Sequence, residues 1–340
     1  MLTSKAPWRT LAISVMLVGA GGVSAQPTPP PLPPKTPVKT ASSSGSAQII
    51  PVSLKNEHVA ASVNGERILV GEVKAVLDQR PYPVTLTEVQ KKELRKAALD
   101  VLIEDVLMRQ YLTKYVPKVD QASYNKEVKD LQDALAKQKK TYAEFLKESG
   151  QTSEQLQRDI IARLQWKQLL GRFYPDAKAK AYYDENKVFF DKIFVRASHI
   201  LIKLPANASK EQVAQATQQM LVWRQEILSA KVKFEDVAKQ HSACESKKNG
   251  GDIGQFPYKF VVVPEFARTA FSLKKGEIGG PIRTSFGVHL ILVTDRTAGE
   301  ATTFDAVKET VREVQAQDDD LYQRILADQR KKGTIKVDLP

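Results

Sequence analysis

The sequence changes character twice, and these two changes constrain its fold more than any other feature. Residues 87–187 place apolar side chains at intervals of three and four, and residues 303–333 do so again, as amphipathic helices do. Between them, residues 196–296 form a compact stretch in which apolar and polar residues alternate as in strands, and glycines separate the segments. A chain of 340 residues is also too long for one ordinary core. We therefore expect two domains, with the middle stretch inserted into a helical body.

The C-terminal stretch gives a reason for the insertion. Its apolar side chains fall on one helical face, and a long apolar face is not stable in water. The helices of residues 87–187 also have apolar faces that must be buried. We therefore expect the C-terminal stretch to pack on them, so that the two distant segments form one domain. The residues of this face are Phe304, Val307, Val311, Val314, Leu321 and Ile325.

Residues 1–25 have the features of a signal peptide. Lys5 and Arg9 precede a short apolar run, residues 11–18, and small residues end at Ala25. The run is shorter than the about 20 residues that span a bilayer, which argues against a membrane anchor. We expect export to the periplasm or another extracytoplasmic compartment, with cleavage after Ala25.

Residues 26–48 form a low-complexity linker, rich first in proline and then in serine. Such composition favours extended and flexible chain, so this segment is interpreted as a disordered tether. A ligand for a proline-recognition domain is the alternative. The tether leaves open whether the mature protein is free or held close to a membrane surface.

The composition excludes several classes of function. Lys and Arg number 51 against 39 Asp and Glu, a net charge of +12, but the basic side chains are interleaved with acidic ones. Without a dense basic stripe carrying aromatic side chains, we expect no nucleic-acid partner. Cys244 is the single cysteine, so neither an intramolecular disulfide nor a multi-cysteine zinc site can form. No metal and no cofactor are expected.

The first half of the folded chain predicts a hairpin and a series of helices. Residues 59–68 contain an Asn-Gly turn between strand-like segments. Helices are expected at 87–115, 124–140, 152–173 and 176–186. A plain helical body and a cradle for client proteins both fit this pattern.

The middle stretch predicts a mixed α+β domain around a small sheet. Its order is strand, two helices, strand, helix, strand. The expected elements are a strand at 197–204, helices at 209–230 and 234–240, a turn at 250–254 feeding a short strand, a helix at 264–271, and a strand at 289–294.

Three of the four histidines and the single cysteine lie in this middle stretch. His199 falls in the first strand and His289 opens the last one, so the two could meet at the centre of the sheet. A buried structural pair and a catalytic pair both fit this spacing. His241 and Cys244 lie between them.

A series of short motifs in this stretch resembles the parvulin family of peptidyl-prolyl cis/trans isomerases. The resemblance runs from residue 196 to 296, and its strength lies in the order and spacing of the pieces rather than in any one. The pieces are Ala197-Ser198-His199-Ile200-Leu201, Phe234-Glu235-Asp236-Val237-Ala238, Gly250-Gly251-Asp252-Ile253-Gly254, Pro264-Glu265-Phe266, Ala270-Phe271-Ser272-Leu273 and Ser285-Phe286-Gly287-Val288-His289.

The resemblance implies a site, residue by residue. His199, His289, Thr284 and Cys244 occupy the positions of the family's polar centre. Ile253, Val262, Phe266 and Phe286 occupy those that line its substrate-binding surface. Two positions depart from the family pattern, because Val262 stands where Met is frequent and Phe286 stands where some members have Ser. Neither departure removes a polar group that the site needs.

The implied reaction needs no nucleophile and no metal, because bond rotation breaks nothing. Rotation about a prolyl peptide bond faces a barrier of about 18–20 kcal/mol and takes tens to hundreds of seconds uncatalysed. Some parvulins select phosphoserine-proline with a basic cluster in the loop after the first strand. Here Lys203 is followed by a loop without an arginine pair, which argues against selection of phosphorylated substrates. General X-Pro bonds are the expected substrates.

The flanking regions resemble the foldase class typified by SurA and PrsA. In that class a Val-x-Asn-Gly-Glu hairpin, like Val63-Asn64-Gly65-Glu66, opens the N-terminal domain. The resemblance predicts a parvulin-type domain at 191–297 and a helical chaperone-like domain made of 49–190 and 298–340. Unfolded or nascent exported proteins with X-Pro bonds are the expected partners, and the oligomeric state stays open. The alternative is a non-catalytic chaperone whose isomerase domain is vestigial.

Overall fold

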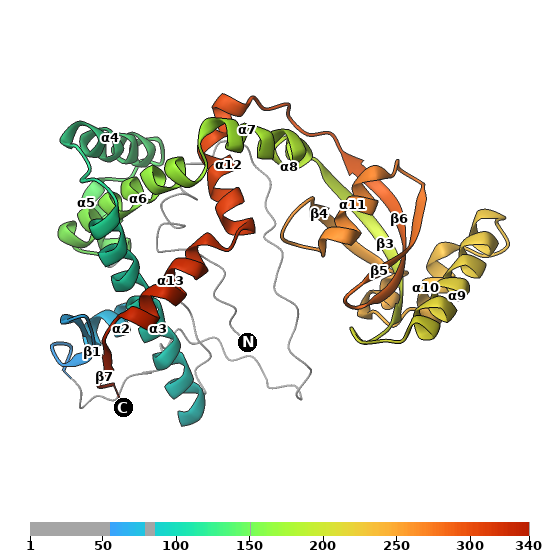
Figure 1. Ribbon diagram of the computed structural model, residues 1–340, viewed down its shortest axis with the longest axis horizontal. Helices are drawn as coiled ribbons and strands as arrows, with labels where there is room; N and C mark the ends of the chain where they lie inside the picture. Colours follow the sequence, from blue (N-terminus) through green and yellow to red (C-terminus); the bar gives the residue numbers. More distant parts are fainter. Residues whose placement is uncertain (1–54, 79–85, 150, 340) are drawn as a thin grey trace. The chain divides into compact units, whose positions relative to one another are not determined.

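The computed structural model describes residues 55–78, 86–149 and 151–339 (Figure 1). The predicted signal peptide and tether lie outside them. The chain divides into two compact units, one of residues up to 175 with 312–340, the other of residues 176–311. We call the described part of the first unit the body and the second unit the insert. Within the described residues, no helix combines the length and apolarity needed to cross a membrane.

The body consists of helices and a small antiparallel sheet with the strand order β2-β1-β7. The predicted hairpin is confirmed, and its turn residues Asn64 and Gly65 have φ of 52° and 87°. The elements are β1 (Val59–Val63), β2 (Glu66–Leu69), α2 (Val70–Asp78), α3 (Glu88–Tyr115), α4 (Gln121–Lys137), α5 (Tyr142–Ser149), α6 (Ser153–Phe173), α13 (Leu321–Lys332) and β7 (Ile335–Val337), with the end of α12 (Phe304–Asp318).

The two longest helices begin where their sequence predicts. Thr87 caps α3 and Thr152 caps α6, and in each case the glutamine three residues later completes a capping box. Such boxes satisfy backbone N–H groups that a helix start otherwise leaves unpaired. The signals are local, which explains why they could be read from the sequence.

The C-terminal segment completes the body. Leu321, Ile325 and Leu326 of α13 belong to the same buried cluster as residues of β1, α2 and α3. Strand β7 pairs with β1, and Ala61 lies opposite Val337. Chain segments from both ends therefore share one core.

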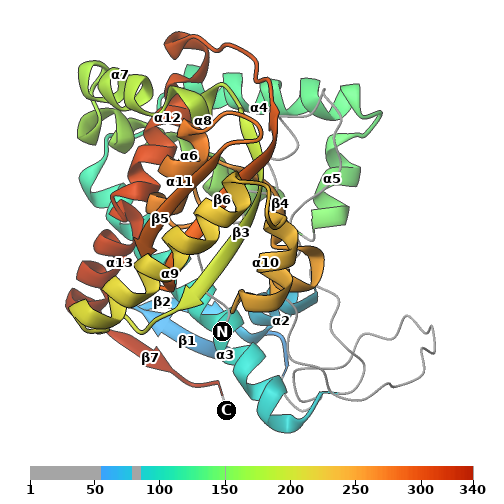
Figure 2. The ribbon, with the colours of Figure 1, turned by 90° about the vertical axis from the view of Figure 1, so that its right-hand side faces the viewer.

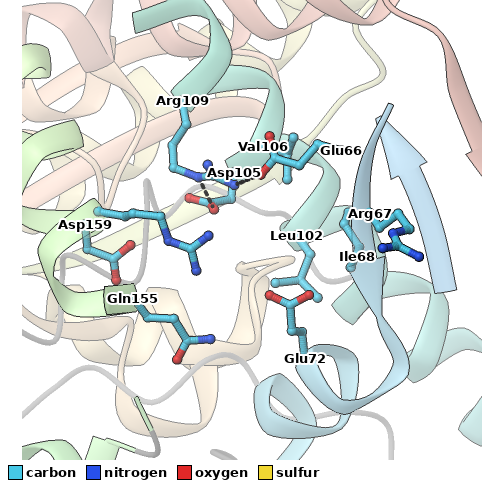
Figure 3. Close-up of a pocket in the computed structure, with 11 residues that line it drawn as sticks. Glu66, Arg67, Ile68, Glu72, Leu102, Asp105, Val106, Arg109, Gln155 and Asp159 are labelled. Carbon is cyan, nitrogen blue, oxygen red and sulfur yellow. Dashed lines mark hydrogen bonds and ion pairs between the residues drawn. The ribbon is translucent and has the colours of Figure 1, made fainter. Parts of the chain in front are cut away.

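Side-chain hydrogen bonds at the β1–β2 turn, which we call the clamp, hold the C-terminal segment to the hairpin and α3. The Asn64 side chain accepts a hydrogen bond from the Thr334 backbone N–H at 2.8 Å and donates one to Gln110 at 2.7 Å. Arg109 donates to Glu66 at 2.7 Å and to Asp105 at 3.1 Å, as Figure 3 shows. The Asn-Gly-Glu turn thus connects the hairpin, α3 and the chain end.

The insert has a four-stranded antiparallel sheet in the order β4-β3-β6-β5. One face carries α11, and the other carries α9 and α10; Figure 2 shows α9 lying along the sheet. The elements are α7 (Asp176–Glu185), α8 (Lys187–Phe190), β3 (Phe194–Lys203), α9 (Lys210–Leu228), α10 (Phe234–His241), a 3₁₀ helix η1 (Glu245–Asn249), β4 (Asp252–Pro257), α11 (Pro264–Ser272), β5 (Ile278–Thr284) and β6 (Gly287–Thr297).

The expected order of three strands was wrong, because β5 is a fourth. Its residues Gly279, Gly280 and Pro281 are typical of a turn rather than a strand. They are tolerated because β5 lies at the edge of the sheet and its pairing with β6 is irregular between Gly279 and Ile282. The mixed α+β class itself is confirmed.

The segments that enter and leave the insert are joined to each other. The Tyr183 hydroxyl donates to the Thr302 carbonyl at 2.5 Å, and the Thr302 N–H donates to Asp191 at 2.9 Å. Phe304 packs against Tyr183, with ring centroids 5.9 Å apart. Because of these contacts α7, α8 and the start of α12 group with the insert, outside the predicted limits of 191–297.

Candidate active site

The two histidines of the insert meet on one face of its sheet. In the β3–β6 ladder, His199 lies opposite Ile291 and His289 lies opposite Leu201. The two histidines are therefore diagonal neighbours on one face, close enough for their rings to touch. Their Nδ1 atoms are 3.2 Å apart, and the rings stack with centroids 5.4 Å apart.

Thr284 of β5 extends this pair into a network. Its Oγ1 lies 2.8 Å from Nε2 of His289 and accepts a hydrogen bond from the Phe286 N–H at 3.1 Å. If the Thr284 hydroxyl donates to His289, then His289 donates through Nδ1 to His199, and only the Nε2–H of His199 lacks a partner. The reverse arrangement leaves two groups unpaired, so we favour the first.

Burial keeps both rings neutral. His199 is 7% exposed and His289 4%. Loss of hydration lowers the pKa of His199 to about 4. The pKa of His289 is also lowered to about 4, first by burial and then by the positive charges that His199 and Arg283 can carry. Both imidazoles are therefore uncharged near neutral pH.

An apolar surface adjoins the pair. The Phe266 ring meets both imidazoles edge to face, with centroid distances of 5.6 Å to His199 and 5.7 Å to His289. Ile253 and Val262 pack against the buried cluster that contains Phe266. Phe286, at the turn between β5 and β6, is 57% exposed and lies outside this cluster.

Cys244 is connected to the pair through backbone and Ser242. The Ser242 hydroxyl accepts hydrogen bonds from the N–H groups of Leu201 at 3.1 Å and Cys244 at 3.3 Å. The Ala243 N–H donates to the Leu201 carbonyl at 2.8 Å. Leu201 is the residue opposite His289, so this loop is fixed beside the pair.

Two of these supporting residues escaped the sequence reasoning. Ser242 had no signal in the sequence beyond its place two residues before Cys244. Arg283 is in β5, which was not predicted, and its guanidinium donates to the Pro205 carbonyl at 2.8 Å. The backbone of His199 lies so close to residue 251 that only glycine fits there, because a Cβ on Gly251 would lie 2.5 Å from the His199 carbonyl oxygen.

Comparison with known proteins identifies both parts of the chain. Residues 199–295 match the PPIC-type PPIASE domain, and residues 44–170 match the SurA-like N-terminal domain. The foldase protein PrsA of Caldanaerobacter subterraneus subsp. tengcongensis is 31% identical over 269 residues, which cover 74% of this chain and 78% of that protein. The chain belongs to the PrsA foldase family. The predicted family is thus confirmed, and this foldase is a peptidyl-prolyl cis/trans isomerase.

Other PrsA proteins align over most of their length. The foldase protein PrsA of Clostridium botulinum strain Loch Maree is 28% identical over 314 residues, which cover 83% of this foldase and 89% of that protein. Among solved structures, peptidylprolyl isomerase PrsA from Bacillus anthracis is 24% identical and covers 68% of this chain and 96% of its own, with a TM-score of 0.37.

The chemistry available at the site is that of a neutral, hydrogen-bonded surface. Across the described residues, no group of three or more His, Cys, Asp or Glu side chains is arranged to hold a metal ion. The site offers imidazole and hydroxyl groups beside an aromatic ring and aliphatic side chains. Such a surface can bind and partly desolvate an uncharged peptide bond.

Proposed function

We propose that this foldase isomerises X-Pro bonds of unfolded exported proteins at the surface formed by His199, His289, Thr284 and Phe266. The observation that carries the proposal is the neutral histidine pair, bonded to Thr284 and flanked edge-on by Phe266, inside a PPIC-type domain. Bond rotation needs a surface that favours the twisted amide and needs no charged group. A buried, uncharged network fits this requirement.

In the proposed mechanism, Phe266, Ile253 and Val262 enclose the proline ring. The planar amide is more polar than the twisted one, so an apolar wall that displaces water favours the transition state. Each tenfold acceleration requires about 1.4 kcal/mol of such preference. The half-exposed Phe286 extends the contact to residues beside the proline.

The polar centre has an orienting role in this proposal. The Thr284–His289–His199 network fixes both rings and leaves Nε2 of His199 as their one nitrogen without a partner among the described residues. Cys244, half-buried and fixed through Ser242, tunes the polarity beside the carbonyl rather than forming a covalent bond. Neutral groups of this kind stabilise a twisted amide without proton transfer.

The body is proposed to hold unfolded clients on its open surface. A cavity of about 50 Å³ between β2, α3 and α6 is lined by charged side chains, among them Asp105, Arg109 and Asp159 (Figure 3). It is too small and too polar for apolar client side chains. By contrast, α3 exposes apolar groups, with Val89 72% and Tyr115 48% exposed.

A protease-coupled assay with a proline-containing peptide tests the catalytic proposal. The full chain should accelerate isomerisation, and His199→Ala and His289→Ala should lower both activity and stability. A fully active, folded Phe266→Ala variant would disprove the proposed pocket. If the wild-type chain does not accelerate isomerisation while it suppresses aggregation of an unfolded client, the alternative of a non-catalytic chaperone holds.

A further inference from the structure

The loop between β4 and α11, residues 258–263, forms neither helix nor strand. It carries Val262 to the apolar cluster that contains Phe266. Its first residue, Tyr258, is anchored by an edge-to-face contact with Phe271, with centroids 5.2 Å apart. The path of this loop therefore determines where one wall of the proposed proline pocket stands.

Phe260, in the middle of the loop, has an unfavourable backbone conformation. Its φ is 72°, in the left-handed region that a bulky side chain rarely occupies. Its ring is 49% exposed, so burial in a core does not hold it there. Conformations of this kind persist only when neighbouring contacts impose them.

The contacts come from α7 and α8, before the first strand of the sheet. The Phe189 ring meets the Phe260 ring nearly perpendicularly, with centroids 5.8 Å apart and an interplanar angle of 88°. Next to it, Nζ of Lys259 lies 5.2 Å from the centre of the Tyr182 ring. Two successive loop residues therefore rest on aromatic side chains of one segment.

This segment is itself firmly packed. Phe190 is 4% exposed and lies against the rings of Tyr182, Tyr183 and Phe189, with centroids 5.3–6.3 Å away. Val188 packs against the same apolar cluster as Val262. Helix α8 thus touches both the cluster and the loop that closes over it.

We propose that Phe189 is a positioning residue for the isomerase reaction, which it serves by holding the 258–263 loop through Phe260. The inference rests on the proposed function, because it takes Val262 to be part of the proline pocket. Phe189 and Tyr182 lie outside residues 199–295, which match the PPIC-type domain. The working pocket of this foldase therefore includes a support from the preceding helices.

Steady-state kinetics of the full chain with a proline peptide test the inference. Phe189→Ala should lower kcat/KM about tenfold, because misplacing a positioning group by an ångström can cost as much as a hundredfold. The loss should appear in kcat as well as in KM, because the proposed wall both binds the proline ring and favours the twisted amide. Phe189→Tyr, which keeps the ring, should retain activity.

A double-mutant cycle separates this role from general destabilisation. Phe189→Ala combined with Phe260→Ala should lose no more than the worse single variant, because both remove the same contact. Phe173→Ala, which changes a 43%-exposed ring in the body, is the matched control and should be fully active. Phe189→Leu, which removes the ring contact but keeps most of the apolar volume, replaces the alanine variant if that one unfolds, and should show the same loss of kcat/KM.

The outcomes distinguish this inference from the proposed function. Unchanged kcat/KM in Phe189→Ala, beside a loss in Phe266→Ala, would overturn the role of Phe189 and leave the pocket intact. Additive losses in the double variant would also overturn it. Unchanged activity in both Phe189→Ala and Phe266→Ala would instead reject the pocket assignment itself.

Discussion

Acidification should destabilise the insert through its histidine pair. The pKa of each imidazole is about 4 in the folded protein, against about 6.5 in an unfolded chain. Between these values the unfolded chain binds more protons than the folded one, so stability is complete above pH 6.5 and falls as the pH drops towards 4. At pH 5 each ring contributes a loss of about 2 kcal/mol, or about 4 kcal/mol for the pair.

Urea unfolding at pH 7.5, 6 and 5 measures this loss. In the chain that starts at Gln26 and carries Trp166→Phe, Trp223 of α9 is the single tryptophan, so its fluorescence reports the insert. With a slope of about 1–3 kcal/mol per molar urea, a loss of about 4 kcal/mol lowers the midpoint by more than about 1 M. The carboxylate of Asp252, whose pKa is lowered chiefly by its hydrogen bond from Arg196, stays ionised throughout this range.

Two variants complete the experiment. His199→Asn with His289→Asn should remove most of the pH dependence, whatever its stability at pH 7.5. His241→Asn changes a third histidine of the insert, which is exposed and stacks on Trp223, and should keep the full dependence. Equal midpoints at pH 5 and pH 7.5 for the parent chain would refute the reasoning that burial keeps the pair uncharged.

Four further experiments address other features. A folded Phe266→Ala variant should lose at least about tenfold in kcat/KM, and because a buried Phe→Ala change costs about 3–5 kcal/mol, thermal unfolding must be measured alongside. Removal of residues 312–340 should accelerate amide exchange in β1 and α3, and unchanged exchange there would contradict the shared core. Asn64→Ala should cost the body about 2 kcal/mol in denaturant unfolding, with Asn64→Gly, which tolerates the positive φ, losing less. N-terminal sequencing of exported protein should begin at Gln26, and an exported chain that retains Met1 would contradict the signal peptide.

The elements that could be predicted from the sequence are those whose causes are local. Thr87, Thr152 and Ser209 each stand at a predicted helix start and have glutamine three residues later, and all three form capping boxes in the structure. Helix α2 was missed because its start lacks such a signal. Helix α2 follows β2 without a break, and Glu72 rather than a Ser or Thr accepts the Leu69 N–H at its start.

In the site too, the residues could be named from the sequence, but their contacts could not. The resemblance named His199, His289 and Thr284, but their contact depends on strand register between residues 90 apart, which no local pattern contains. Spacing alone did not decide between a structural and a catalytic pair. Ser242 and the edge-on approach of Phe266 appear only when the sheet and α11 are assembled.

The clamp at Asn64 has a consequence for the order in which the molecule is made. Its bond to Thr334 joins residues 270 positions apart, and β1 lacks β7 as a neighbour until the last residues are available. The insert, by contrast, is one continuous segment, residues 176–311. When the chain emerges from its N-terminus first, the insert can therefore fold while the body is still incomplete, because long-range pairings form late. During its own biogenesis, the foldase has its isomerase unit finished before the domain that surrounds it in sequence.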